Sequence, residues 1–388
     1  MTKILVPSAS HILTDHYLSS EGTFCYTLFK NLEKYGYQFE AISAYVKVNK
    51  PLKNTVFHQA GSEAITPTMD PIRKYSTRIK FMLQAYRKSL KIIEKHKIDI
   101  IHHMLPAVYN QTFSPLAIMG KTRKHPFIFG PLSAHIHPRP LDEKILLPIT
   151  SKLHKKTVQK SDAIITITEY VKNLYSKFLN EEKIRVIPLG IDTEKFKPAK
   201  NPHKEENHYE ILFTGYLYKI KGVEHLIKAI KIVLEKEKKK NIRLRIVGEG
   251  PEKPHLEKLA EALKIKNKVI FEGFIPYTKI HKYYQKCDIF CFPTLGEPFG
   301  KAIVEAMACA KPVIASNIGG PKEIIDNGVN GLLVPPANPE KIAEKIINLL
   351  EDKHLRKKIG ENARKKAIEK YSWRKISQEY HKLYKSLI

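Results

Sequence analysis

The sequence contains little cysteine and tryptophan, with four Cys and one Trp among 388 residues. Four unevenly spaced cysteines do not form the dense disulfide framework of a small secreted domain. Cys287 and Cys291 stand four residues apart, but no further His or Cys pair lies near them to complete a zinc site. We therefore expect reduced, buried thiols and no metal centre built on them.

Long hydrophobic runs are also absent. No segment approaches the ~18 consecutive apolar residues that span a bilayer. The first twenty residues hold only a short apolar run, which is less than the core of a signal peptide. The sequence thus predicts a cytoplasmic protein, whose only expected membrane contact is peripheral and on the inner face.

Acidic residues are few: 39 Asp and Glu stand against 67 Lys and Arg, which leaves a net charge of +28. Such an excess attracts nucleic acid, anionic membranes or phosphorylated small molecules. We do not expect nucleic acid as a partner, because no recognition module is present and aromatic residues are not clustered among the basic ones. With 43% hydrophobic residues, a largely disordered chain is excluded.

Short apolar runs alternate with longer amphipathic stretches, which is typical of parallel sheets covered by helices. Helices are expected at residues 24–34 and 73–97, and residues 49–70 are expected to be irregular. The expected strands begin at Lys3, Phe39, Ile98, Pro126, Ala163 and Ile184 in the first half, and at Glu210, Arg243, Lys268, Asp288, Lys311 and Gly331 in the second.

The alternation breaks at residues 196–210, a charged stretch with two prolines that has the composition of an interdomain linker. We therefore expect an α/β protein with two Rossmann-like parallel-sheet domains facing a cleft. The first covers residues 1–198 and the second residues 199–370. Residues 371–388 are expected to form a helix that packs back on the first domain.

The stretch GEPFGKAIVEAMACAKPVIASNIGGPKEII, residues 296–325, carries two carboxylates at a turn into a helix. Glu297 lies on the expected loop and Glu305 inside the helix. Free amides at the helix start stabilise an anion such as a diphosphate, and a carboxylate accepts hydrogen bonds from sugar hydroxyls. The alternative is two ordinary acids, one near a helix N-terminus and one on a helix surface.

Several glycine turns follow expected strands. Gly215 begins a turn that leads to Lys219 and Lys221, Gly248 follows the next strand, and Gly22 lies before the first helix. None matches the dinucleotide fingerprint G-x-G-x-x-G. Together, at the ends of strands, they indicate a site where backbone approaches a nucleotide phosphate.

Residues 163–370 are similar to the retaining nucleotide-sugar glycosyltransferases of family four, which have the GT-B fold. EPFGKAIVE fits the E-x7-E signature of that family and ASNIGGPKEII fits the loop that follows it. The first half resembles the family in layout only. The resemblance implies transfer of a hexose from a UDP- or GDP-linked sugar, with no cofactor and no metal.

The resemblance also implies roles for single residues. Glu297 would contact the donor sugar, Glu305 the ribose, and Lys221 the departing diphosphate. The donor-binding residues implied with them are Phe299, Gly300 and Lys301 through their amides, and Phe274 beside the base.

Two departures from the family pattern concern the phosphates. Tyr216 stands where the family has an arginine, so an uncharged phenol replaces a cation, and Lys219 is the candidate to compensate. Gly22 alone replaces the usual pair of glycines. A catalytic histidine is expected on a strand-end loop of the first domain. His135 is the candidate, His137 and the pair His102 and His103 are other possibilities, and an ordinary loop or solvent-facing histidine is the alternative for each.

No nucleophile stands where it could form a covalent intermediate, so we expect front-face attack with the departing phosphate as base. Alternatives of the same fold are a sugar phosphorylase, a sugar-nucleotide epimerase, or a transferase weakened by Tyr216. The acceptor would be a glycan, a small molecule or a lipid-linked sugar. Nine Lys and Arg against one acid at residues 73–97 fit either an anionic membrane surface or a solvated helix back.

Overall fold

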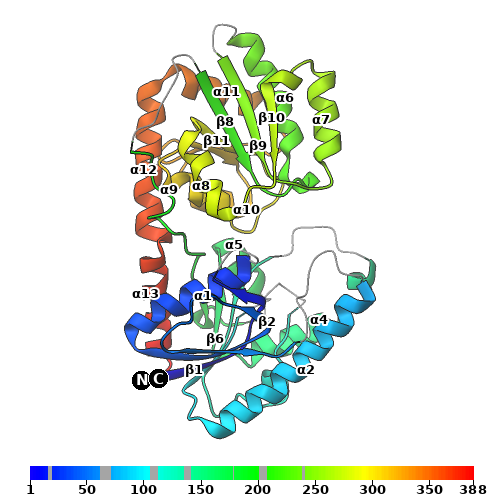
Figure 1. The fold of residues 1–388 in the computed structure, drawn as a ribbon, viewed down its shortest axis with the longest axis vertical. Coiled ribbons are helices and arrows are strands. Elements are labelled where there is room, and N and C mark those ends of the chain that lie inside the picture. Colours follow the sequence, from blue (N-terminus) through cyan, green and yellow to red (C-terminus); the bar gives the residue numbers. More distant parts are fainter. Residues whose placement is uncertain are drawn as a thin grey trace. The chain divides into compact units, whose positions relative to one another are not determined.

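The computed structural model describes residues 1–15, 20–61, 71–104, 112–134, 141–177, 179–200, 208–237 and 241–388. The chain forms two compact units (Figure 1). The first unit is Met1–Leu189 with Ile376–Ile388, and the second unit is Gly190–Lys375. Each contains one parallel sheet with helices around it, so the expected α/β fold with two Rossmann-like sheets is confirmed.

The described part of the first unit contains a seven-stranded sheet of order β3-β2-β1-β4-β5-β6-β7. Because β1 lies between β2 and β4, the strand order reverses at the β1/β4 edge, where open α/β sheets bind ligands. Its strands are β1 (Thr2–Thr14), β2 (Tyr37–Lys47), β3 (Thr55–Gln59), β4 (Ile100–His103), β5 (Phe127–Leu132), β6 (Ala163–Thr166) and β7 (Ile184–Val186). Its helices are α1 (Ser20–Leu32), α2 (Pro71–Lys95), α3 (Pro115–Ile118), α4 (Leu141–Gln159) and α5 (Glu169–Tyr175).

The second unit holds a six-stranded sheet of order β10-β9-β8-β11-β12-β13, and its strand order reverses at the β8/β11 edge. Its strands are β8 (His208–Thr214), β9 (Asn241–Val247), β10 (Val269–Gly273), β11 (Ile289–Phe292), β12 (Val313–Ser316) and β13 (Leu332–Val334). Its helices are α6 (Val223–Lys236), α7 (Lys253–Ala262), α8 (Tyr277–Lys286), α9 (Lys301–Ala308), α10 (Gly319–Ile324), α11 (Pro339–Glu351) and α12 (Lys353–Tyr371).

Two details differ from the sequence-based expectations. Residues 55–59 form β3, a short edge strand, although residues 49–70 read as irregular; residues 62–70 lie outside the described ranges. The division between the units falls after Leu189, earlier than the charged stretch suggests. The reason is that Phe196 is fully buried against the rings of Tyr277 and Tyr284, which makes this segment part of the second core.

The last helix, α13 (Trp373–Lys385), packs on the first unit, as expected. The buried His102 ring links it to the sheet: Nε2 donates to the Gly130 carbonyl at 2.8 Å, so Nδ1 accepts from the Tyr384 hydroxyl at 2.7 Å. The Tyr37 hydroxyl also meets His381 Nδ1 at 2.9 Å. His102 therefore anchors the C-terminal helix, because both of its ring nitrogens are used inside the fold.

Helix α2 turns one face to the core through Thr77, Phe81, Ala85, Ser89 and Ile92, all of which are buried. Its basic residues lie mainly on the opposite side. Among them, Ile79 and Leu83 are each 54% exposed. Helix α2 therefore buries one face in the core, and the large apolar side chains of Ile79 and Leu83 are exposed on its basic side. No helix in the described ranges is long and apolar enough to cross a membrane.

Buried histidines make the stability of the first unit depend on pH. Burial lowers the pKa of His102 to about 3, and that of His103 and His154 to about 4. The unfolded chain binds these protons near pH 6.5, whereas the folded chain does not. Stability is therefore complete above pH 6.5 and falls as the pH drops toward 4.

We expect a loss of about 2 kcal/mol per buried histidine between pH 7 and pH 5. Unfolding in urea followed by circular dichroism at both pH values measures it. In His102→Gln, the loss of unfolding free energy between pH 7 and pH 5 should be smaller by about 2 kcal/mol, whatever the stability of the variant at pH 7. An equal loss in the variant and the parent would contradict the assignment.

Candidate active site

The loops that follow β8, β9, β10, β11 and β12 meet at one edge of the second sheet, beside its β8/β11 switch point. They carry the expected donor-binding residues of this unit. These are Gly215, Tyr216, Lys219 and Lys221 after β8, Gly248 after β9, Phe274 after β10, and Glu297, Phe299, Gly300, Lys301 and Glu305 after β11. The topology therefore brings to one edge what the sequence distributes over some ninety positions.

Glycines allow these loops to touch through their backbones. A Cβ on Gly248 would lie 1.9 Å from the Gly215 oxygen, and one on Gly222 would lie 2.1 Å from the Pro293 oxygen. The Gly248 amide also donates to the Gly273 carbonyl at 2.8 Å. Gly248 has φ +141, a conformation that only glycine adopts without strain. Its first role is thus to fix the positions of neighbouring loops.

Lys221 and Glu297, both expected as catalytic residues, form an ion pair. Lys221 ends a short 3-10 turn after β8, and Glu297 lies on the loop after β11. Lys221 Nζ donates to Glu297 Oε2 at 2.6 Å, and the two side chains are only 14% and 15% exposed. The loops are tied together beside them, since the Leu295 amide donates to the Ile220 carbonyl at 2.7 Å.

The start of α9 offers a set of free amides. Within the described part of the chain, the amides of residues 299–302 donate to no backbone carbonyl. Gly300 caps the helix with φ +98, and the Phe299 side chain is 3% exposed and packs edge-on against Tyr371. Phe299 therefore presents only its backbone to this end of the helix. Such amides, together with the helix dipole, stabilise a bound anion.

Glu305 is held by two tyrosines. It is 4% exposed; Oε1 accepts from the Tyr277 hydroxyl at 2.6 Å, and Oε2 from the Tyr284 hydroxyl at 2.9 Å. Thr214, the last residue of β8, contacts the Tyr284 hydroxyl at 2.7 Å. Burial and the Glu305 charge raise the pKa of Tyr284 well above its usual value. A carboxylate has about four acceptor positions, and the two hydroxyls use two of them, while Lys301 Nζ lies 3.8 Å from Oε1.

Two ammonium groups lie against the Tyr277 ring. Lys195 Nζ is 4.3 Å from the ring centre and Lys301 Nζ is 4.6 Å from it. Burial lowers the pKa of Lys195, while the nearby Asp192 and Glu305 charges oppose that shift. Cation–π contact thus fixes the ring whose hydroxyl binds Glu305.

The sequence-based prediction missed Tyr277, Tyr284 and Lys195. One signal was available: the two tyrosines are seven residues apart on α8, which places them on one helical face. Lys195 gave no signal, because it lies in a segment that read as a linker.

Tyr216 and Phe274 are largely exposed, at 68% and 70%. Lys219 is exposed as well. All three follow strands of the second sheet at the same edge as Lys221 and Glu297. No group of three His, Cys, Asp or Glu suited to a metal ion occurs among the residues that the structure describes.

The expected residues of the first unit are less informative. Gly22 lies in the first turn of α1, where a Cβ would be 1.8 Å from the Ile12 oxygen, so it lets α1 pack directly on β1. His135 lies outside the described residues. All four cysteines are buried and free, as expected.

Comparisons with known proteins cover both halves of the chain. Residues 22–195 match the family described as Glycosyltransferase Family 4, and residues 194–366 match Glycosyl transferases group 1. The chain is 30% identical over 341 residues to the uncharacterized glycosyltransferase MJ1178 of Methanocaldococcus jannaschii, covering 86% of each protein. It is 36% identical over 238 residues to MJ1607 of that organism, covering 58% of this chain and 60% of the relative.

A solved structure shows the same fold. The structure is that of HepE of Anabaena in complex with UDP-glucose. Its alignment with this chain covers 100% of both chains, with a TM-score of 0.65 and 18% identity. Both halves of the chain match glycosyltransferase families, and MJ1178 aligns along most of its length. These findings agree with the family that the E-x7-E signature indicates. The chain belongs to the group 1 glycosyltransferases of family four, with a GT-B fold.

Proposed function

We propose that this chain transfers a hexose from a UDP- or GDP-linked sugar to an acceptor hydroxyl, with retention of the anomeric configuration. The observation that carries the proposal is the Lys221–Glu297 pair beside the open amides of α9. A cation and a helix N-terminus suit a diphosphate, and a carboxylate beside them suits sugar hydroxyls. Membership of the family favours a transferase over a phosphorylase, an epimerase or a nucleic-acid binder.

The donor is assigned to named groups in this proposal. The amides of Phe299, Gly300 and Lys301 receive the diphosphate together with Lys221, Glu297 accepts from the sugar, and Glu305 accepts from the ribose. Phe274 and Gly248 line the side of the base. That HepE, a protein of this fold, is described in complex with UDP-glucose supports a nucleoside-diphosphate sugar.

The transfer step follows from front-face attack. The acceptor oxygen bonds to the anomeric carbon while the bond from that carbon to the diphosphate oxygen breaks. The acceptor proton passes to the departing phosphate oxygen, and Lys221 balances the charge that develops there. His135 and Gly22 are the proposed contributions of the first unit.

The proposed acceptors are a glycan, a small molecule or a lipid-linked sugar, reached from an anionic membrane surface. Ile79 and Leu83, exposed among the basic residues of α2, support peripheral contact with such a surface. Basic residues near an anionic surface contribute about 1 kcal/mol each, and apolar side chains add insertion.

Donor binding is tested by a thermal-shift panel of UDP-glucose, GDP-mannose and ADP-glucose. The true donor at about 100 times its Kd should add about 2.7 kcal/mol of stability. Glu305→Gln and Lys221→Met should each weaken binding by about 10- to 100-fold, since each removes a charged hydrogen-bonding partner. Glu344→Gln, an exposed ion-paired glutamate, is the matched control and should bind normally. Equal affinity in all four proteins would refute the assignment.

Tyr216→Arg tests whether the missing cation limits turnover. We expect kcat to rise about tenfold, because a guanidinium would stabilise the departing diphosphate. Tyr218→Arg, at a neighbouring exposed tyrosine, controls for added charge. The same gain in both variants, or no gain in Tyr216→Arg, would show that Tyr216 does not limit the reaction.

Membrane contact is tested by flotation with phosphatidylglycerol and phosphatidylcholine vesicles. We expect binding to the anionic vesicles only, reduced at least fivefold in Leu83→Glu and abolished by high salt. Val329→Glu changes a side chain of equal 54% exposure in the second unit and should bind as the parent does. Unchanged flotation of Leu83→Glu would exclude this face of α2.

A further inference from the structure

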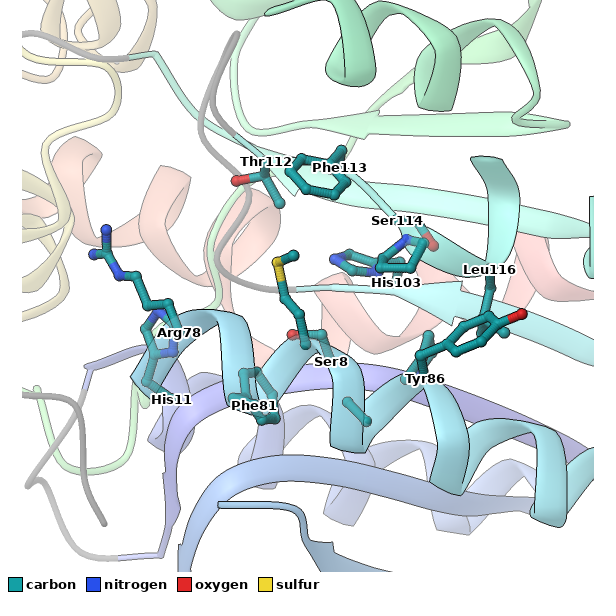
Figure 2. A pocket seen from close by; sticks show the side chains of 14 residues that line it. Ser8, His11, Arg78, Phe81, Tyr86, His103, Thr112, Phe113, Ser114 and Leu116 are labelled. Carbon is teal, nitrogen blue, oxygen red and sulfur yellow. The ribbon is translucent and has the colours of Figure 1, made fainter. Parts of the chain in front are cut away.

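The first unit contains a cavity of about 190 Å³ next to its β1/β4 switch point (Figure 2). Side chains of β1, β4 and α2 and of the segment that leads into α3 line it. Apolar and aromatic groups dominate, among them Phe81, Met82, Tyr86, Phe113 and Leu116. Figure 2 shows Arg78 and His11 at one end of the cavity, and Tyr86 and Leu116 at the other.

The size of the cavity limits what it can hold. An apolar cavity of about 150 Å³ binds benzene in another protein, so about 190 Å³ accommodates a six-membered ring or a branched chain of similar bulk. Most of its wall surface is apolar, although Ser8, His11 and Arg78 also line it, and along the apolar part the hydroxyls of a bare sugar would lose hydrogen bonds to water. An apolar skeleton fits this environment.

One polar group faces this space without a partner. His103 lines the cavity and is 5% exposed, and its Nδ1 has no hydrogen-bond partner among the described residues. The ring packs edge-on against Phe129 at 5.5 Å. His102, the preceding residue, uses both of its nitrogens. A buried nitrogen without a partner is destabilising, and a ligand hydroxyl would supply the missing hydrogen bond.

The His103 ring is neutral at physiological pH, because burial lowers its pKa to about 4. A neutral imidazole both donates and accepts one hydrogen bond. Its Nδ1 can therefore donate to or accept from a ligand hydroxyl, depending on the tautomer. In Figure 2 the ring reaches toward the space between Phe113 and Ser8.

We propose that this cavity binds the apolar part of the acceptor, and that the acceptor is an apolar alcohol or phenol whose hydroxyl hydrogen-bonds to His103. The identification of this ligand as the acceptor rests on the proposed function. The binding site itself does not, because it lies wholly within the first unit and requires no donor.

Binding of p-cresol and toluene, measured by ligand-observed NMR, tests the site. We expect saturable p-cresol binding, with toluene about tenfold weaker because it lacks the hydroxyl. His103→Phe should remove that preference. Ala85→Phe, which fills the cavity from α2, should abolish binding of both probes, and Leu83→Phe on the exposed side of α2 should leave it unchanged. A far-UV circular dichroism spectrum and a thermal unfolding midpoint close to those of the parent show that each variant is folded.

No saturable p-cresol binding, or binding that survives Ala85→Phe, overturns the site. Incubation with p-cresol and the donor found in the thermal-shift panel then tests the acceptor class, with mass spectrometry of the p-cresyl glycoside as readout. Ala85→Phe should lower that product at least tenfold. Binding without product refutes the acceptor role alone, whereas a cavity that binds in a chain that takes no nucleotide sugar refutes the proposed function alone.

Discussion

The site of the second unit depends on the close approach of loops that leave neighbouring strands. A lysine after β8 meets a glutamate after β11 at 2.6 Å only because backbone touches backbone around them. Gly222 against Pro293 and Gly248 against Gly215 leave no room for a Cβ. These glycines hold the loops, and the loops hold the charges. Glycine is therefore required at these positions by the packing of the loops, whether or not it also contacts a ligand.

The opposing charges of Lys221 and Glu297 also explain how the site can be stable without a ligand. An isolated ammonium or carboxylate at this degree of burial is costly, and pairing offsets that cost. A bound diphosphate would bring its own negative charge to Lys221 and release the carboxylate for sugar hydroxyls. The pair thus links the two ends of the proposed donor through a single contact.

Most of the fold was predictable, because buried parallel strands are apolar runs and the helices between them are periodic. The strand β3 was missed since an edge strand five residues long has no such signal. Spacing, glycine turns and the family resemblance made Glu297, Lys221 and Glu305 candidates, and the structure places them after β8 and β11. The tyrosines that hold Glu305 were not, because a tyrosine on α8 shows its partner only when the strand order places α8 beside α9.

Two adjacent histidines show why burial alone does not identify a functional group. His102 and His103 are both buried, and burial lowers the pKa of each. His102 donates to a strand carbonyl and accepts from a tyrosine of the last helix, so its hydrogen bonds are used in folding. His103, one residue along the strand, faces the other side of the sheet, where a cavity replaces the partner. Alternation along β4 therefore separates a histidine that uses both ring nitrogens inside the fold from one whose Nδ1 has no partner among the described residues.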